Sequence, residues 1–153
     1  TEVAGYMQQL REQGRYTVSD ALLAKIRETF AGGCCNDIQT REKIGRAWRD
    51  HRYLIDTHTA VAYHVLDEYR RETGDAAPAV VVSTASPFKF CDQVLRGIGG
   101  TADAFGPELI RRLTCETQID APAPLTGLDA RPVRFGGCVD RTQMLHTVDE
   151  FLK

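Results

Sequence analysis

The segment Ala79-Val80-Val81-Val82 is the strongest strand signal in the chain. A short run of β-branched and small apolar residues is typical of a strand that is buried on both faces, as in a parallel sheet. It leads into the hydroxyl-rich run from Ser83 to Pro87 and then into a predicted helix over residues 88–96. Only residues 132–135 offer a second, short strand. Because so few strands cannot form a parallel sheet, we expect the rest of the sheet to belong to chain outside these 153 residues.

Most of the remaining sequence has the apolar periodicity and the capping residues of helices. The predicted helices cover about residues 2–13, 20–31, 38–51, 56–73, 88–96, 107–115 and 141–152. Gly32 and Gly33 are expected to end the second helix, on whose apolar face Phe30 would lie. In the last helix the residues expected to face inward are Met144, Leu145, Val148, Phe151 and Leu152.

Helices around a central buried strand predict an α/β protein, here helix-rich and with few strands of an incomplete parallel sheet. We expect residues 1–52 to form a helical packing region. Residues 53–153 would form the α/β part and contribute one wall of a ligand pocket. A length of 153 residues is enough for a single segment with a real core.

Composition excludes several classes of partner. The formal net charge of -2 provides no basic surface for nucleic acid or for an anionic membrane, so we expect neither partner. The five cysteines are an odd number, and no secretory signal opens the chain, which favours reduced thiols in the cytoplasm. No Cys-x-x-Cys pair is present, so we predict no metal site, and a zinc or thiol-redox protein is disfavoured.

The first candidate site is the run from Ser83 to Ser86. In open α/β sheets, ligands bind beyond the carboxyl ends of the strands, where the next helix begins. Hydroxyl groups at this point can bond to a ligand, and backbone N–H groups can meet an anion. The alternative is that one of these hydroxyls only caps the helix that starts at Pro87. Both roles can hold for different residues.

The second candidate site is Asp56-Thr57-His58-Thr59, which precedes the longest predicted helix. Asp56 or Thr57 is expected to cap that helix. His58 is the alternative, as a base or a ligand. His64 lies six residues further on, a spacing that does not bring two side chains onto one helical face. A metal site made of two histidines is therefore not expected here.

Two longer strings contain these sites, and together they resemble the late motifs of threonine synthases. They are YLIDTHTAVAYHV (residues 53–65) and VVVSTASPFKF (residues 80–90). The helix start at residues 16–20 and the closing helix at 144–152 agree with the same family, so the resemblance spans nearly the whole chain. Family members often carry proline and histidine where this chain has Thr57 and Ser86.

The resemblance implies a pyridoxal-phosphate enzyme of fold type II, related to tryptophan synthase. The full-length protein would be a carbon–oxygen lyase that converts O-phospho-L-homoserine and water into L-threonine and phosphate. In that family a hydroxyl at the position of Thr84 faces the pyridine nitrogen of the cofactor, and Ser83 and Ser86 are its neighbours. Lys89 and His58 are candidates for contact with the substrate, although Lys89 is also typical of an exposed helix lysine.

The same resemblance assigns the remaining parts of the active site to the earlier half of the family's sequence. These parts are the lysine that forms a Schiff base with the cofactor, an asparagine beside the cofactor ring and a glycine-rich phosphate loop. We therefore expect this segment to have no catalytic residue of its own and to be inactive alone. Its partner would be that earlier half, or a second copy of the segment. The alternative is a non-catalytic binding or regulatory module derived from the same fold.

Overall fold

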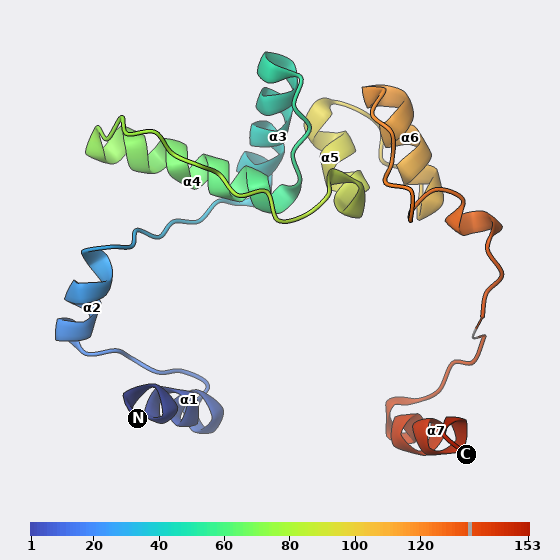
Figure 1. Cartoon of the computed structure of the whole chain (residues 1–153), viewed down its shortest axis with the longest axis horizontal. Helices are drawn as coiled ribbons and strands as arrows, with labels where there is room; N and C mark the ends of the chain where they lie inside the picture. Colours follow the sequence, from blue (N-terminus) through green and yellow to red (C-terminus); the bar gives the residue numbers. More distant parts are fainter. Residues whose placement is uncertain (135) are drawn as a thin grey trace. The chain divides into compact units, whose positions relative to one another are not determined.

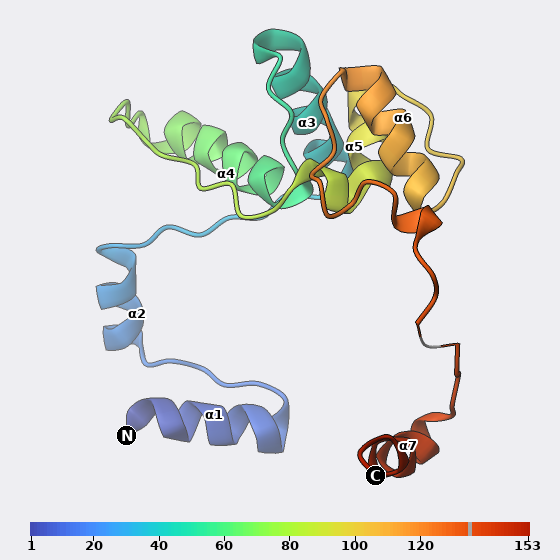
Figure 2. The same cartoon turned by 45° about the vertical axis from the view of Figure 1, so that its right-hand side comes forward.

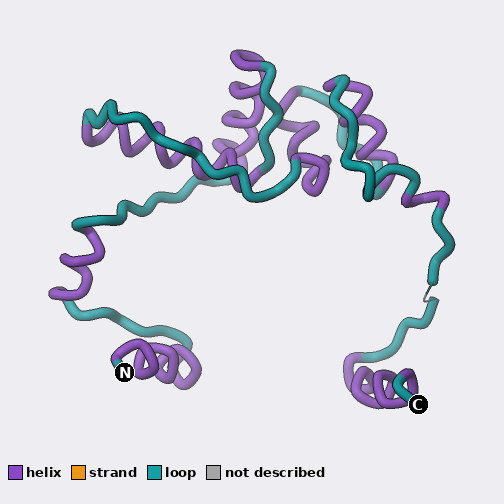
Figure 3. Tube along the Cα trace, in the orientation of Figure 1, coloured by secondary structure: helices purple, strands orange, loops and turns teal. Residues whose placement is uncertain are grey.

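The structure, a computed structural model, describes residues 1–134 and 136–153. Within these residues it contains helices and loops and no strand (Figure 3). The chain divides into two compact units, residues 1–103 and residues 104–153, each of which is described by itself. None of the helices in the described ranges has the length and apolar character that crossing a lipid bilayer requires.

The first unit contains six helical elements (Figure 1). They are α1 (Glu2–Gln13), α2 (Asp20–Arg27), α3 (Asp37–His51), α4 (Thr57–Thr73), the 3-10 turn η1 (Pro87–Phe90) and α5 (Cys91–Ile98). Side chains cap three of the helices at their first turn, with Ser19 at α2, Asn36 at α3 and Asp56 at α4. Asn36 and Gln39 form a complete capping box. These helices begin where the sequence predicts them, because a cap acts over only a few residues.

Helix α3 packs against both α4 and α5, and this cluster holds the core of the unit (Figure 2). The fully or nearly fully buried apolar residues of the cluster and of the segments beside it are Ile44, Ala47, Ile55, Ala60, Phe88, Cys91, Val94 and Leu95. Helices α3 and α5 therefore present apolar stripes to each other, as the sequence periodicity predicts, whereas α4 buries only Thr59 and Ala60.

Two glycines allow α3 and α5 to approach closely. A Cβ atom at Gly45 would overlap the carbonyl oxygen of Gly97, and one at Gly97 would lie 3.0 Å from the Cβ of Ile44. Neither glycine is needed for an unusual backbone angle, because neither has a positive φ. Their role is to leave space where the two helix backbones meet.

The second unit contains α6 (Pro107–Thr117), the 3-10 turns η2 (Leu128–Ala130) and η3 (Arg141–Gln143), and α7 (Met144–Phe151). Asp140 caps the η3 turn, which leads into α7, and its carboxylate accepts a hydrogen bond from the Thr142 N–H at 2.9 Å. The prediction that the apolar face of α7 points inward is wrong for this chain. The exposed fractions of its apolar side chains run from 53% at Val148 to 75% at Leu145, and Leu152 directly after the helix is 76% exposed.

Two further expectations differ from the structure. Helix α2 ends at Arg27 rather than at Gly32, and Phe30 is 70% exposed. A short helix draws most of its stability from packing. No residue of α2 is buried, so no packing contact stabilises further turns of this helix. The predicted buried strand at 79–82 is a loop, with Val80 90% exposed.

A strand exists only when a neighbour pairs with its backbone, and none of the described residues does so here. In the second strand candidate, residues 132–134 form no strand and Phe135 lies outside the described residues. The predicted division of the chain after residue 52 stays a prediction.

Candidate functional site

The first part of the site is the start of α4, where Asp56 is fully buried. One carboxylate oxygen, Oδ1, accepts hydrogen bonds from the backbone N–H of His58 at 2.8 Å and of Thr59 at 3.3 Å. The other oxygen, Oδ2, accepts a hydrogen bond from the Thr59 hydroxyl. Asp56, one of the two caps that the sequence allows, is therefore the N-cap of α4. It is also a buried acceptor whose two oxygens are both used.

The second part of the site is the hydroxyl run after residue 82, and Thr59 joins it to α4. Thr59 Oγ1 lies 3.0 Å from Ser83 Oγ, within hydrogen-bond distance. Thr59 is 95% buried, since only 5% of it is exposed, whereas Ser83 is exposed. The structure thus brings together the two candidate sites that the sequence places 24 residues apart.

The three hydroxyl groups of the run differ in their surroundings. The Ser83 hydroxyl pairs with Thr59, and the Ser86 hydroxyl accepts a hydrogen bond from the Phe88 N–H at 3.3 Å and caps η1. The Thr84 side chain is exposed, and its hydroxyl has no partner among the described residues. Of the three, Thr84 is the one whose hydroxyl group makes no hydrogen bond to the described residues, so its full capacity is left for a ligand.

The two candidate substrate residues both lie against the ring of Phe90. The His58 ring meets it edge to face, with 5.0 Å between the ring centroids. The Lys89 Nζ lies 5.6 Å from the centre of the same ring. His58 and Phe90 also line an open pocket of about 350 Å³, together with Thr57 and Gln93. The exposed side chains of His58 and Lys89 can therefore meet a solvent-accessible anion.

An apolar pocket of about 270 Å³ lies beside Ser83. Its lining includes Tyr53, Ile55, Tyr63 and Val81. Since Val81 belongs to the loop at 79–82, the pocket borders the segment that the sequence predicts as a strand.

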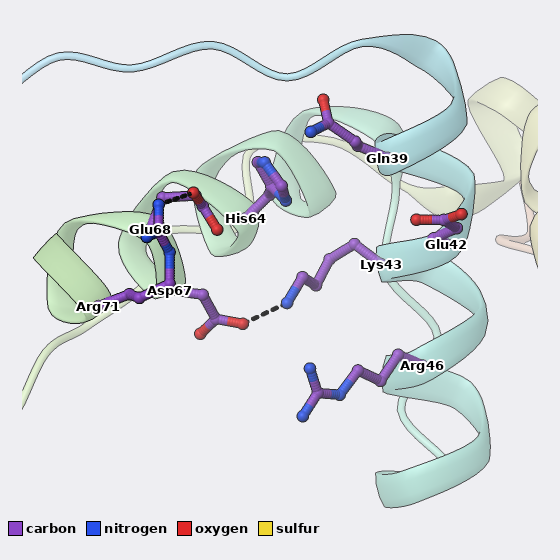
Figure 4. A pocket seen from close by; sticks show the side chains of 8 residues that line it. All are labelled: Gln39, Glu42, Lys43, Arg46, His64, Asp67, Glu68 and Arg71. Carbon is purple, nitrogen blue, oxygen red and sulfur yellow. Dashed lines mark hydrogen bonds and ion pairs between the residues drawn. The ribbon is translucent and has the colours of Figure 1, made fainter.

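A larger groove of about 380 Å³ lies between α3 and α4 (Figure 4). Figure 4 shows the Lys43 ammonium of α3 reaching the Asp67 carboxylate of α4, an ion pair in which Lys43 is only 7% exposed. The same ammonium lies 4.4 Å from the centre of the Tyr63 ring. Cations and carboxylates alternate in the rest of the lining, which is Gln39, Glu42, Arg46, His64, Glu68 and Arg71. The groove therefore has no excess charge of one sign, and its central contact ties α3 to α4.

The one buried cysteine is not a reactive thiol. All five are free thiols, and Cys91 is buried in α5. Burial raises the pKa of the Cys91 thiol to about 11, so this group stays protonated at neutral pH. No cluster of three or more histidine, cysteine or acidic side chains that could hold a metal ion occurs among the described residues.

The sequence includes Thr59 in the second candidate site but assigns it no role of its own. Asp56 is the N-cap and Thr59 is the third residue of the helix. This spacing is a local signal that the sequence contains. Thr59 and Ser83 are 24 residues apart, and no sequence pattern predicts their contact.

Comparison with known proteins places this arrangement in one class. Solved threonine synthases have the same fold over 99% of the chain. One is the pyridoxal-phosphate-bound enzyme from Brucella melitensis, with a TM-score of 0.70 and 29% identity. Another is the yeast enzyme, with a TM-score of 0.74 and 20% identity, which supports the fold alone. The fold is that of the C-terminal region of fold-type II pyridoxal-phosphate enzymes.

A family model described as threonine synthase, C-terminal, matches residues 59–150. The chain belongs to this family. The threonine synthase of Pseudomonas aeruginosa is 31% identical over 107 residues, which cover 70% of the chain. The chain spans only part of these relatives, namely 22% of the Pseudomonas protein and 28% of the Brucella protein.

Proposed function

We propose that this chain is the C-terminal part of a threonine synthase, which converts O-phospho-L-homoserine and water into L-threonine and phosphate. The observation that carries the proposal is the family match over residues 59–150, which includes Thr59 and the whole hydroxyl run at 83–86. The full-length protein is then a pyridoxal-phosphate-dependent carbon–oxygen lyase. In it, the exposed segment at 79–82 becomes a paired strand of a parallel sheet whose other strands come from the earlier part of the protein.

The surroundings of Thr84 fit a cofactor that needs one hydroxyl partner. Thr84 is exposed, and its hydroxyl is not used by the described residues, whereas those of Ser83 and Ser86 are. In the proposed complex the Thr84 hydroxyl lies at the pyridine nitrogen of pyridoxal phosphate, and Ser83 and Ser86 support the same turn. Pyridoxal phosphate, when bound, supplies an electron sink for carbanion chemistry at the substrate.

A threonine at the ring nitrogen acts through a neutral hydroxyl. A hydroxyl can donate or accept one hydrogen bond there without supplying a full charge. A carboxylate would instead hold a proton on the nitrogen. Thr84 therefore orients the ring and leaves its nitrogen largely unprotonated.

Lys89 and His58 are the proposed contacts for the phosphate group of the substrate. Both are exposed, and both lie against Phe90. Phe90 is the ring that both side chains contact, and the Lys89 ammonium provides a charge-assisted hydrogen bond to an anionic oxygen.

The segment alone is proposed to be inactive, because the family places its cofactor-linked lysine in the earlier part of the sequence. Its partner is that earlier part, or a second copy of the segment. The five free thiols support a location in the reducing cytoplasm.

The test is expression of the full reading frame upstream of Thr1 together with this segment, in parallel with the 153-residue chain. Phosphate and threonine release from O-phospho-L-homoserine are measured with pyridoxal phosphate present. We expect turnover by the full protein and none by the segment. Thr84→Val should lower kcat by about 10-fold or more, because the loss of one preorganised hydrogen bond costs this much, whereas Thr84→Ser should retain most of it. Turnover by the segment alone, or a full protein that folds and releases no threonine, would overturn the proposal.

A further inference from the structure

We infer that Asp56 and Thr59 are positioning residues, which act through Ser83 to hold the Thr84 turn in place. The inference deepens the proposed function and rests on it only for the identity of the ligand that Thr84 meets. Neither residue is placed against substrate or cofactor. Their contribution is to fix where the segment at 83–86 lies relative to α4.

The starting point is the burial of the Asp56 carboxylate. A buried carboxylate is costly unless its oxygens accept hydrogen bonds. Asp56 is 0% exposed and accepts three such bonds, from two backbone N–H groups and from the Thr59 hydroxyl. An ordinary helix cap needs only the backbone contacts. The bond from Thr59 to Asp56 is additional, and it fixes the orientation of the Thr59 hydroxyl.

The Thr59 hydroxyl faces two acceptors. It lies within donating distance of the Asp56 carboxylate and, at 3.0 Å, of the Ser83 hydroxyl oxygen. A threonine hydroxyl carries one proton, so Asp56 and Ser83 share a single donor. The result is a continuous contact from Asp56 through Thr59 to Ser83.

The hydrogen bonds of Asp56, Thr59 and Ser83 connect residues 78–85 to the start of α4. Among the described residues, Ser83 is the one member of that stretch whose backbone or side chain makes a hydrogen bond. The stretch otherwise runs as a loop, with Val80 and Val82 exposed. Thr84 follows Ser83 directly, and Ser86 is fixed to η1 by its cap. Thr84 therefore lies between two anchored residues, and the Ser83 anchor depends on Thr59.

The experiment uses the full-length protein and measures amide hydrogen exchange of residues 83–86 together with cofactor affinity. Thr59→Val keeps the shape of the side chain and removes the hydroxyl, and Ser83→Ala removes the other end of the contact at an exposed position. We expect each to speed exchange at 83–86 by about 3- to 10-fold, as the loss of one net hydrogen bond allows, and to weaken cofactor binding by a similar factor. Thr59→Ser should restore both values.

The matched control is Thr117→Val in α6. Thr117 is also a buried threonine, 7% exposed, but its hydroxyl donates to the Leu113 carbonyl of its own helix at 2.6 Å. Thr117→Val should leave amide exchange at 83–86 unchanged. The double variant Thr59→Val/Ser83→Ala should be no worse than Thr59→Val alone, because Thr59→Val already removes the contact that Ser83→Ala removes.

The outcomes separate the two proposals. If the unaltered full protein fails to bind pyridoxal phosphate, the proposed function fails, and the exchange rates still decide whether Thr59 holds the turn. The positioning role is wrong if amide exchange at 83–86 is no faster in Thr59→Val and Ser83→Ala than in Thr117→Val. Additive effects in the double variant would overturn it as well, since they would mean two independent contacts.

Discussion

Helices α5 and α7 are both eight residues long and both have an apolar face, yet only α5 is buried. Val94 and Leu95 of α5 are completely covered, whereas Leu145 and Phe151 of α7 are more than 70% exposed. Helix α5 has α3 as its neighbour. The one element that α7 contacts substantially among the described residues is the turn η3 just before it. The periodicity of a helix thus shows which face is apolar, and a partner element decides whether that face is buried.

The largest expected difference between the two helices comes from shortening one leucine in each. Leu95→Ala should lower the free energy of unfolding by about 2–5 kcal/mol, because it leaves a cavity in a closed core. Leu145→Ala should change it by less than about 0.5 kcal/mol, because its side chain is already 75% exposed. Urea unfolding of the chain, followed by circular dichroism, measures both. A large loss in Leu145→Ala would show that α7 is covered in solution.

The close approach of α3 and α5 can be tested with two helix-interior glycines. Gly45→Ala should cost about 1–3 kcal/mol of unfolding free energy, because the added Cβ overlaps the Gly97 carbonyl and forces the helices apart. Gly5→Ala in α1 is the matched control, since no atom lies within 4 Å of the new Cβ. It should be neutral or raise helix content, because alanine favours a helix by about 1 kcal/mol over glycine. Thermal unfolding of both variants gives the comparison. Equal effects would mean that α3 and α5 do not meet at Gly45.

The sequence predicts local features of this chain well, as the helix starts show. Ser19, Asn36 and Asp56 all cap the helices that follow them, because a cap and its acceptor lie within three residues of each other. The sequence also predicts Ile44, Ala47 and Trp48 on one stripe of the helix at 38–51, where Ile44 and Ala47 are buried and Trp48 is half-buried. The end of α2 at Arg27 was not predictable, because it depends on packing that α2 does not have.

The candidate site also has a part that the sequence predicts and a part that it does not. The hydroxyl run and the Asp56 cap are visible in the sequence, whereas the contact between Thr59 and Ser83 depends on how the loop folds back onto α4. For the strand predicted at 79–82, the local signal is present and the long-range contact is absent among the described residues. Its residues have the right composition, but pairing is a property of two segments, and none of the described residues pairs with it.

The smallest expected effect is a dependence of stability on pH that distinguishes the buried cysteine of α5 from an exposed cysteine of the second unit. The pKa of Cys91 is raised from 9.0 to about 11 in the folded chain, so the unfolded chain loses the thiol proton first as the pH rises. The unfolded state then binds fewer protons, and stability falls, by about 1 kcal/mol between pH 9 and pH 10. Cys91→Ala should remove this part of the slope.

Cys138→Ala, at an exposed cysteine, is the control and should keep the slope. Lysine and tyrosine groups titrate in the same range, so the quantity to compare is the difference in unfolding free energy between each variant and the unaltered chain at pH 8, 9 and 10. If Cys91→Ala and Cys138→Ala show the same dependence, Cys91 is accessible to water in solution. The core around α5 would then open more readily than its zero exposure at Val94 and Leu95 indicates.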